Sequence, residues 1–305
     1  MKVSVLLKAY NHEPFIARAL ASVLEQRTDF PFEIVIGEDC STDGTRAMLL
    51  GMRDRDPRIR LLLRDRNLGN IRNLTDTLAA CRGEYVALLD GDDYWTSADK
   101  LQTQAAFLDA HPHYSSCAHN AVVVDATAQS VLGTYRPPHP SHAITLRRML
   151  SGDPVPTSAV MFRRGLFGEF PAWYYTIMMG DWPLHVLNLR HGPMWYDACV
   201  WGAHRVHAGG LWSGANTVRR RTARIEIYRR LNEELQFAHD ALIRRRIARQ
   251  YLALAEHYAG VGDARQMREC LRQALRACRW NPRVMLRRSF LRLLPELLRT
   301  QSSQA

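Results

Sequence analysis

The sequence lacks any long apolar run. No stretch of 18 or more apolar residues occurs in its 305 residues, whereas a helix that crosses a bilayer needs about 20. Residues 2–7 are strand-like directly after Met1, without the charged and apolar regions of a secretory signal. We therefore expect neither a membrane-spanning helix nor a signal peptide, and we expect a cytoplasmic protein.

Cysteines are few, and none is spaced as zinc ligands are. The six are scattered along the chain, at Cys40, Cys81, Cys117, Cys199, Cys270 and Cys278. Zinc sites need ligands at short, regular spacings, and disulfide frameworks are typical of small secreted domains. The pattern therefore favours reduced thiols over disulfides or a zinc site.

Lysine is absent from the C-terminal third, which is nevertheless the basic part of the chain. Residues 214–305 contain 20 arginines and 8 acidic residues, whereas residues 1–213 contain 21 basic and 22 acidic residues. The formal net charge of +11 therefore belongs to the C-terminal third. This asymmetry predicts two domains, residues 1–213 and an Arg-rich helical region at 214–305. The basic region suits an anionic membrane surface or a polyanion, although solvated helix faces would have the same composition.

The first hundred residues alternate strand-like and helix-like segments, as α/β sheet proteins do. Apolar runs predict strands at residues 2–8, 32–37, 59–63 and 84–89. Helical spacing of apolar residues predicts helices at residues 13–26, 43–53 and 69–81. Parallel strands joined by crossover helices place their binding loops at the carboxyl ends of the strands. Four loops would then converge, at residues 9–13, 38–43, 64–72 and 90–95.

The pattern is less regular after residue 95. It predicts strands at residues 114–124, 157–163 and 196–203, helices at 142–150 and 181–190, and a proline-rich loop at 134–141. From residue 215 onwards the sequence is almost continuously helical, with breaks near residues 239, 260–263, 281–282 and 295. Residues 251–280 faintly resemble one tetratricopeptide-type helical hairpin, a unit that is normally stabilised by stacking on further copies.

Three carboxylates follow the predicted strand at residues 84–89. Asp90, Asp92 and Asp93 lie within four residues of one another. Carboxylates this close repel one another unless a cation neutralises them, and oxygen ligands suit Mg²⁺ or Mn²⁺. A polar turn that closes the strand is the simpler alternative. Other motifs in the chain are needed to distinguish a cation site from a polar turn.

Four sequence blocks, taken in order, resemble those of family-two glycosyltransferases with the GT-A fold. The blocks are VSVLLKAYN at 3–11, FEIVIGEDCSTDGT at 32–45, NLG at 67–69 and DGDD at 90–93. The resemblance covers residues 1–213. It implies an α/β fold with a Rossmann-like mixed sheet flanked by helices, followed here by an all-helical C-terminal extension. It also implies a nucleotide-diphospho-sugar donor that lies across the ends of the four strands.

The resemblance also implies a set of donor-binding residues. Those expected to bind the nucleotide sugar are Tyr10, Asn11, Glu13, Asp39, Arg72, Asp90, Gly91, Asp92, Asp93 and Arg205. Tyr10, Asn11 and Asp39 would hold the base, because a carboxylate can accept the N–H of a ring imide. Glu38 stands where an aspartate is more usual in the family. The alternatives are that Asp39 is a helix-capping loop residue and that Arg72 is an ordinary surface arginine.

Within the acidic block, Asp92 would bind Mn²⁺ or Mg²⁺, which neutralises charge on the departing diphosphate. Asp90 would reach the ribose or a metal-bound water. Asp93 would orient the loop or meet sugar hydroxyls. Near the end of the matched region, residues 203–213 resemble a Tyr-Arg-x-His-x-Gly-Gly segment, with His204 in place of the tyrosine. His207 would complete the metal shell or hold the diphosphate, and Arg205 would pair with phosphate oxygens.

Asp181 is the expected general base. It follows the aromatic residues 173–175 and opens a predicted helix, as the base-bearing motif of the family does. A single carboxylate that takes the proton of the acceptor hydroxyl fits direct displacement with inversion at the anomeric carbon, because a retaining enzyme also needs a nucleophile there. The alternative is that Asp181 only caps the helix, a position that aspartate favours.

These features predict a metal-dependent inverting glycosyltransferase. The expected donor is a UDP- or dTDP-sugar, and the expected acceptor is a saccharide or a lipid-linked sugar of a cell-surface polysaccharide or glycoconjugate. Peripheral contact with an anionic membrane at the inner face, through the amphipathic stretch at residues 290–299, is also expected, and nucleic-acid binding is not. The alternatives are a non-catalytic nucleotide-sugar-binding scaffold and a transferase that acts on a small natural product.

Two other enzyme classes fit less well. Phosphatases of the haloacid type place their nucleophilic aspartate on the first strand of the fold, whereas Asp92 follows the fourth predicted strand. Sugar-phosphate nucleotidyltransferases have a glycine-rich basic loop after the first strand, and residues 9–14 contain no glycine.

Overall fold

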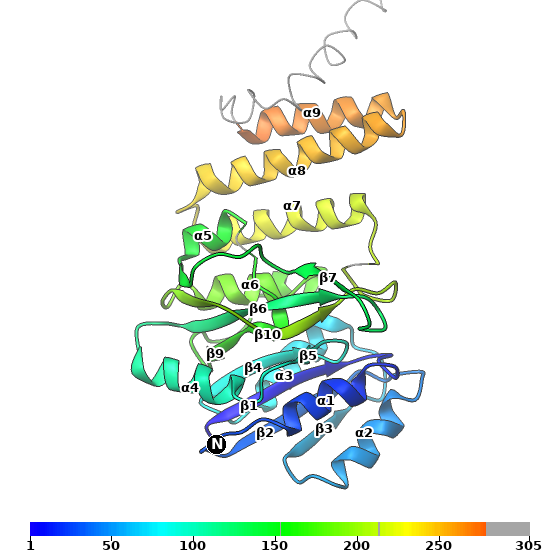
Figure 1. Cartoon of the computed structure of the whole chain (residues 1–305). Coiled ribbons are helices and arrows are strands. Elements are labelled where there is room, and N and C mark those ends of the chain that lie inside the picture. The colour runs from blue at the N-terminus through cyan, green and yellow to red at the C-terminus, as the bar shows by residue number, and fades with distance from the viewer. Residues whose placement is uncertain (153, 213, 279–305) are drawn as a thin grey trace, which may run out of the picture. The chain divides into compact units, whose positions relative to one another are not determined.

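The computed structural model describes residues 1–152, 154–212 and 214–278. The chain divides into two compact units, Met1–Ala208 and a second unit that starts at Gly209 (Figure 1). The first unit is an α/β structure, and the described part of the second is helical. The predicted domain boundary between residues 213 and 214 lies a few residues beyond this division and stays a prediction.

The described residues of the first unit form one ten-stranded mixed sheet. Its strands are β1 (Val3–Ala9), β2 (Phe32–Glu38), β3 (Ile59–Leu63), β4 (Tyr85–Asp90), β5 (Tyr94–Trp95), β6 (Ser116–Val124), β7 (Val131–Thr134), β8 (His142–Ile144), β9 (Met161–Arg163) and β10 (Met194–Arg205). Its helices are α1 (Ile16–Leu24), α2 (Thr45–Arg53), α3 (Asn70–Ala80), α4 (Lys100–Ala110), α5 (Leu146–Leu150) and α6 (Asp181–Asn188), with 3₁₀ turns η1 (Thr157–Ala159) and η2 (Ala172–Thr176). The strand order is β3-β2-β1-β4-β9-β6-β10-β5, with β7 beside β6 and β8 beside β10 (Figure 1).

Strands β3, β2, β1 and β4 form a run of four parallel strands, and β6 and β10 form a further parallel pair. β1 and β4 are buried and largely apolar, as expected of parallel strands that are covered on both faces. In register, Lys8 of β1 lies opposite Gly37 of β2 and Asp90 of β4. The three strands therefore end side by side. We call this side of the sheet, with the loops at residues 9–13, 38–43 and 90–95, the carboxyl edge.

The predicted α/β arrangement is confirmed. Each of the four strands predicted in the first hundred residues lies within one residue of β1, β2, β3 or β4. The three helices predicted between them correspond to α1, α2 and α3. Apolar residues at positions 16, 20 and 23 of α1 and at the alternate positions 3, 5 and 7 of β1 belong to the same buried core, which explains why the sequence periodicity predicted both elements.

Four segments after residue 95 differ from the prediction, one of them the short exposed strand β7, which was not predicted. The helix predicted at residues 142–150 is β8 followed by the short helix α5, which Thr145 caps by accepting the backbone N–H of Arg148. The strand predicted at residues 157–163 begins as the turn η1 and becomes β9 only at Met161. Helix α4 is missing from the prediction. Its Lys100 and Gln104 are buried, so apolar residues alone do not mark its inner face.

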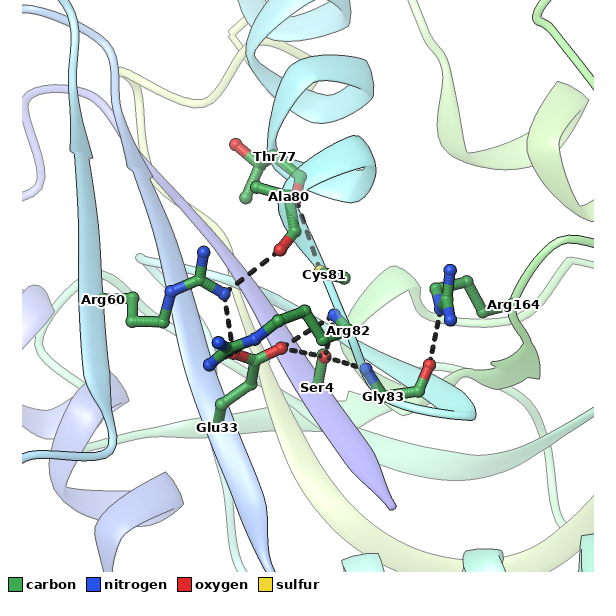
Figure 2. Close-up of polar contacts among 9 residues, drawn as sticks. All are labelled: Ser4, Glu33, Arg60, Thr77, Ala80, Cys81, Arg82, Gly83 and Arg164. Carbon is green, nitrogen blue, oxygen red and sulfur yellow. Dashed lines mark hydrogen bonds and ion pairs between the residues drawn. The ribbon is translucent and has the colours of Figure 1, made fainter. Parts of the chain in front are cut away.

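A buried carboxylate joins the strands at the opposite, amino-terminal side of the parallel sheet (Figure 2). Glu33 of β2 accepts hydrogen bonds from the hydroxyl of Ser4 (2.7 Å), the backbone N–H of Arg82 (2.8 Å) and the guanidinium groups of Arg60 (2.6 Å) and Arg82 (2.8 Å). Burial opposes ionisation, but these hydrogen bonds outweigh it and lower the pKa of Glu33 to about 2. We call Ser4, Glu33, Arg60 and Arg82 the amino-edge cluster.

Helices α7 (Thr217–Glu234), α8 (Asp240–Gly260) and α9 (Ala264–Cys278) form the described part of the second unit. The predicted breaks near residues 239 and 260–263 are confirmed, and Gly262 has the left-handed φ of +78° that favours glycine. The predicted breaks at 281–282 and 295, the end of the hairpin predicted at 251–280, and the stretch at 290–299 lie outside the described residues. Within those that are described, no helix is long and apolar enough to cross a membrane.

Candidate active site

The acidic turn after β4 is held by its own backbone and by a glycine. The N–H of Gly91 donates to the carbonyl of Lys8 (2.9 Å), and the N–H of Asp93 donates to the carbonyl of Asp90 (3.0 Å). A Cβ on Gly91 would lie 2.5 Å from the imidazole Nδ1 of His12 and 2.9 Å from the Lys8 carbonyl. Gly91 is therefore needed for the close approach of this turn to β1, a structural role beside the predicted one in donor binding.

The three carboxylates of this turn have three different surroundings. Asp90 pairs with the ammonium of Lys8 at 2.8 Å. Asp93 is buried, and it accepts the backbone N–H of Arg205 and the hydroxyl of Ser158, both at 2.9 Å. Burial raises the pKa of Asp93 in spite of the adjacent His204. The carboxylate of Asp92 lies 3.0 Å from Nε2 of His207. The crowding predicted from the sequence is therefore resolved by turning the three side chains toward different partners.

Asp92 and His207, the residues predicted to hold a metal ion, lie side by side. Their side chains are 19% and 12% exposed, so an ion can reach them. Burial opposes ionisation of Asp92, but the hydrogen bond with His207 and the nearby imidazoles outweigh it and hold its pKa below the usual range. No group of three or more His, Cys, Asp or Glu side chains among the described residues is placed to hold a metal. This pair fits Mn²⁺ or Mg²⁺ only if donor oxygens and water supply the other ligands, as is usual in sites that bind metal with phosphates.

Arg205 bonds the main chain of the acidic turn. Its guanidinium donates to the carbonyls of Asp92 (2.8 Å) and Ala126 (2.6 Å) and lies 4.7 Å from the centre of the Phe15 ring. The same ring contacts the imidazole of His207, with ring centres 4.8 Å apart. Arg205, the last residue of β10, and His207, two residues later, therefore both contact Phe15. The guanidinium is directed at main-chain oxygens, and the predicted contact of Arg205 with phosphate stays a prediction.

The predicted base-binding residues lie in the loops after β1 and β2. Asp39 is buried, and its two carboxylate oxygens accept the backbone N–H groups of Leu68 (2.7 Å) and Gly69 (3.0 Å). Burial raises the pKa of Asp39, and these two hydrogen bonds oppose the rise. Tyr10 is 41% exposed, so its ring is free to contact a ligand. Arg72, in the first turn of α3, lies over the ring of Tyr175 at 4.6 Å.

Asn11 and Glu13 link the first of these loops to the second. Asn11 has a left-handed φ of +53°, and its side-chain oxygen accepts the backbone N–H of Thr42 at 2.8 Å. Glu13 accepts the backbone N–H of Gly44 at 2.8 Å, just before α2. These contacts show that both residues shape the loops; their predicted contacts with the nucleotide stay predictions. Glu38, the departure from the family pattern, is buried against Arg46.

Asp181 comes to the carboxyl edge from a distant part of the chain. It is the first residue of α6, and Gly180 occupies the N-cap position, so Asp181 lies in the first turn and does not itself cap the helix. One carboxylate oxygen accepts the hydroxyl of Thr157 at 2.5 Å. The other, Oδ1, is buried and has no hydrogen-bond partner within the part of the chain that the structure describes. This oxygen retains the bonding capacity that a general base requires, and the role of Asp181 as the base stays a prediction.

Lys8 pairs with the acidic turn and was not among the predicted site residues. Its ammonium donates to the side-chain oxygen of Asn70 at 2.8 Å as well as pairing with Asp90. Burial lowers its pKa, but the charges of Asp90, Asp181 and Asp92 outweigh this and raise it. A lysine at the end of an otherwise apolar buried strand is a signal that the sequence does contain. Thr157 and Ser158, which hold Asp181 and Asp93, gave no such signal.

The comparisons with known proteins agree with this geometry. The model of glycosyl transferase family 2 matches residues 4–170. An uncharacterized protein of Mycobacterium tuberculosis is 35% identical over 223 residues, which are 72% of this chain and 63% of that protein. The chain thus spans less than two thirds of the length of this relative.

Solved structures show the same fold. A crystal structure of S. aureus TarS residues 1–349 with UDP-GlcNAc has a TM-score of 0.67 and 20% identity, covering 93% of this chain and 83% of that one. TarS is a poly(ribitol-phosphate) beta-N-acetylglucosaminyltransferase, 36% identical over 117 residues, or 36% of this chain and 19% of TarS. The mannosyltransferase PcManGT from Pyrobaculum calidifontis with GDP-Man and Mn²⁺ has a TM-score of 0.58 and 17% identity, covering 100% and 88%. The predicted GT-A fold is confirmed, and the chain belongs to glycosyl transferase family 2.

Proposed function

We propose that this protein is a metal-dependent inverting glycosyltransferase that moves a sugar from a nucleotide-diphospho-sugar to an acceptor hydroxyl. The observation that carries the proposal is the arrangement around Lys8. Its ammonium pairs with Asp90 and is influenced by the charges of both Asp92 and Asp181. A carboxylate suited to a metal and a carboxylate suited to proton transfer thus belong to one site. Membership of the family supports the same reaction.

On the donor side, Tyr10, Asn11 and Asp39 hold the base. The exposed ring of Tyr10 offers a surface on which a base can stack. Asp39 already accepts two backbone N–H groups, but a carboxylate has about four acceptor positions, so it can also accept a base N–H. Its burial strengthens such a hydrogen bond, because fewer water molecules compete for it.

The diphosphate lies against the acidic turn. Asp92 and His207 hold Mn²⁺ or Mg²⁺, which when bound supplies the positive charge that stabilises the departing nucleoside diphosphate. Asp90 and Lys8, at 2.8 Å from one another, line the same side, where Lys8 contributes a fixed cation. Asp93 is directed inward by Ser158 and Arg205 and keeps the turn in shape. PcManGT, which shares the fold, was crystallised with Mn²⁺.

On the acceptor side, Asp181 takes the proton from the attacking hydroxyl. Thr157 holds one of its oxygens and leaves Oδ1 for the acceptor. The hydroxyl oxygen forms a bond to the anomeric carbon as the bond to the diphosphate oxygen breaks, so the configuration at that carbon inverts. A general base contributes typically 10²- to 10⁴-fold to such a rate.

The names of the structural neighbours bear on the substrates. TarS was crystallised with UDP-GlcNAc and is named for transfer to poly(ribitol-phosphate). We infer a UDP- or dTDP-sugar donor and, as acceptor, a saccharide or lipid-linked sugar of a cell-surface polysaccharide or glycoconjugate. Such an acceptor fits a cytoplasmic protein that meets the inner face of the membrane through its arginine-rich C-terminal region, which has 20 arginines and 8 acidic residues.

A donor-panel assay tests the proposal. The purified full chain is incubated with UDP-, dTDP- and GDP-sugars and Mn²⁺ or Mg²⁺, and nucleoside diphosphate release is measured with and without saccharide acceptors. We expect one donor to be consumed only with metal, and the product to have inverted anomeric configuration by NMR. If no donor is hydrolysed or transferred, the protein is a scaffold rather than an enzyme.

Asp181→Asn identifies the base. We expect the variant to bind the donor with wild-type affinity and to lose transfer by about 10²- to 10⁴-fold. Asp54→Asn is the matched control, because Asp54 is an exposed carboxylate that pairs only with its neighbour Arg53 in the described structure. Transfer at the wild-type rate by Asp181→Asn would move the base to another residue.

A further inference from the structure

We propose that η1 is the element that positions both halves of this site, with Thr157 setting the orientation of Asp181 and Ser158 that of the acidic turn. The inference rests on the function proposed above, because it takes Asp181 as the base. It assigns Thr157 and Ser158 as positioning residues. Neither needs to touch the substrates, and each acts through the carboxylate that it holds.

The two hydroxyls of η1 bond to carboxylates from opposite parts of the chain. The Thr157 hydroxyl donates to Oδ2 of Asp181 at 2.5 Å, and the Ser158 hydroxyl donates to Oδ2 of Asp93 at 2.9 Å. Asp93 belongs to the turn after β4, and Asp181 begins α6. Two adjacent residues therefore fix the donor-side turn and the proposed base relative to each other.

The main chain of η1 is itself anchored to the core. The indole N–H of Trp95 donates to the Ser158 carbonyl (2.7 Å), and the side-chain amide of Gln104 donates to the Ala159 carbonyl (2.9 Å). The next carbonyl, that of residue 160, accepts the N–H of Leu88 in β4 at 3.0 Å. Ser158 and Ala159 are fully buried, at 1% and 0% exposure. A turn held by three main-chain contacts cannot tilt easily, so its two hydroxyls are fixed donors.

Holding one oxygen of Asp181 fixes the orientation of its carboxylate. The bond from Thr157 favours a single rotamer, so Oδ1, which is buried and has no partner among the described residues, keeps a constant position in the site. Without this bond, the carboxylate would sample other orientations. Thr157 should therefore affect the proton-transfer step, and Ser158 should affect donor binding.

The experiment compares Thr157→Val, Thr157→Ser and Ser158→Ala in the full chain. Valine matches the shape of threonine without the hydroxyl, and serine keeps the hydroxyl. We expect Thr157→Val to lower kcat by about 10- to 100-fold with unchanged donor affinity. Thr157→Ser should restore kcat. Ser158→Ala should weaken donor binding. Thr28→Val is the matched control, since its hydroxyl bonds a local carbonyl, that of Phe30 at 2.8 Å.

The outcomes separate this inference from the proposed function. If wild type transfers a sugar and Thr157→Val has the same kcat as wild type, the inference is overturned while the function stands. If Thr157→Val and Ser158→Ala lower kcat, donor affinity and thermal stability alike, the turn is only a structural support and the inference is again overturned. If Thr157→Val does not fold, the comparison of Thr157→Ser with Ser158→Ala decides in the same way. A wild-type chain that transfers nothing contradicts the proposed function itself.

Discussion

Carboxylates lie at both ends of the four parallel strands β3, β2, β1 and β4, but their hydrogen bonds and pKa values differ. At the amino edge, both oxygens of Glu33 are hydrogen-bonded by groups of the chain itself, including two guanidiniums (Figure 2). At the carboxyl edge, Oδ1 of Asp181 has no partner in the described residues, and burial raises the pKa of Asp39 and Asp93. The difference between the two ends is therefore one carboxylate oxygen, Oδ1 of Asp181, and the raised pKa values of Asp39 and Asp93, whose oxygens are themselves hydrogen-bonded.

The difference indicates what each end is for. A buried charge whose hydrogen bonds are complete holds elements together, and removing its partner is costly. A buried charge left incomplete lowers the stability of the free protein, but it has bonding capacity that a ligand can use. The comparison predicts that substitutions at the amino edge change stability and spare function, and that substitutions at the carboxyl edge do the reverse.

Asp92→Asn should give the largest effect. We expect it to weaken metal-dependent donor binding and to lower transfer by about a thousandfold, because a metal ion contributes several kcal/mol of charge stabilisation. The melting temperature should change little, since the turn keeps the main-chain hydrogen bonds of Gly91 and Asp93. Isothermal titration with donor, with and without Mn²⁺, measures the first effect, and thermal unfolding measures the second.

The control for Asp92→Asn is again Asp54→Asn, which should bind donor as wild type does. If Asp92→Asn keeps wild-type donor affinity in Mn²⁺, Asp92 does not bind the metal. If instead the variant unfolds at a much lower temperature, Asp92 stabilises the fold as Glu33 does, and the predicted difference between the two edges is wrong.

Glu33→Gln should have the next largest effect, on stability alone. Removing the charge at the centre of a buried network is expected to cost about 3 kcal/mol in the free energy of unfolding. The folded pKa is lowered from 4.5 to about 2, so this stabilisation is fully present above pH 4.5 and is lost as the pH falls toward 2. Urea unfolding at pH 7 and pH 3 should therefore show a smaller difference between wild type and variant at pH 3.

Glu84→Gln is the matched control for that measurement. Glu84 is 53% exposed and pairs with Lys2 at 2.8 Å, and a surface pair of this kind contributes at most about 1 kcal/mol. Donor affinity of the folded protein should be unchanged in both variants. A loss of donor affinity in Glu33→Gln would mean that the two ends of the sheet are not independent.

The carboxyl edge was largely predictable because its residues belong to local patterns. Apolar runs mark β1, β2 and β4, and Asp39 and Asp92 lie in short blocks directly after two of these strands. Asp181 could be placed by its position at the start of a helix. Parallel strands bring their ends together whatever the details of packing, so the convergence of these loops followed from the order of elements alone.

The rest depends on contacts that no local pattern contains. The bonds of η1 join residues 157 and 158 to residues 181 and 93, and the segment is too short and too apolar to be distinguished from a strand. Helix α4 buries Lys100, which lies over the Trp95 ring at 3.8 Å, so a polar residue occupies the face where periodicity predicts an apolar one. In both cases tertiary packing overrides the local signal.

Lys8→Met gives the smallest expected effect and the sharpest test, because a matched residue exists at the other end of the sheet. Lys8 pairs with Asp90 at 2.8 Å and Arg60 pairs with Glu33 at 2.6 Å, so each is a cation beside a carboxylate on the parallel strands. Only Lys8 is also influenced by Asp181 and Asp92, whose charges help to raise its pKa against the effect of burial. We therefore expect Lys8→Met to weaken donor binding about tenfold, or about 1.4 kcal/mol, with little change in melting temperature.

Arg60→Met should show the opposite pattern, a lower melting temperature with wild-type donor affinity. Donor titration and thermal unfolding give the donor affinity and the melting temperature of both variants. We expect donor affinity to fall only in Lys8→Met and the melting temperature to fall only in Arg60→Met. If Lys8→Met loses stability as Arg60→Met does and binds donor normally, Lys8 is a structural partner of Asp90. The pairing of Asp90 would then be structural, like that of Glu33. Oδ1 of Asp181, which has no partner among the described residues, would be the remaining difference between the two edges.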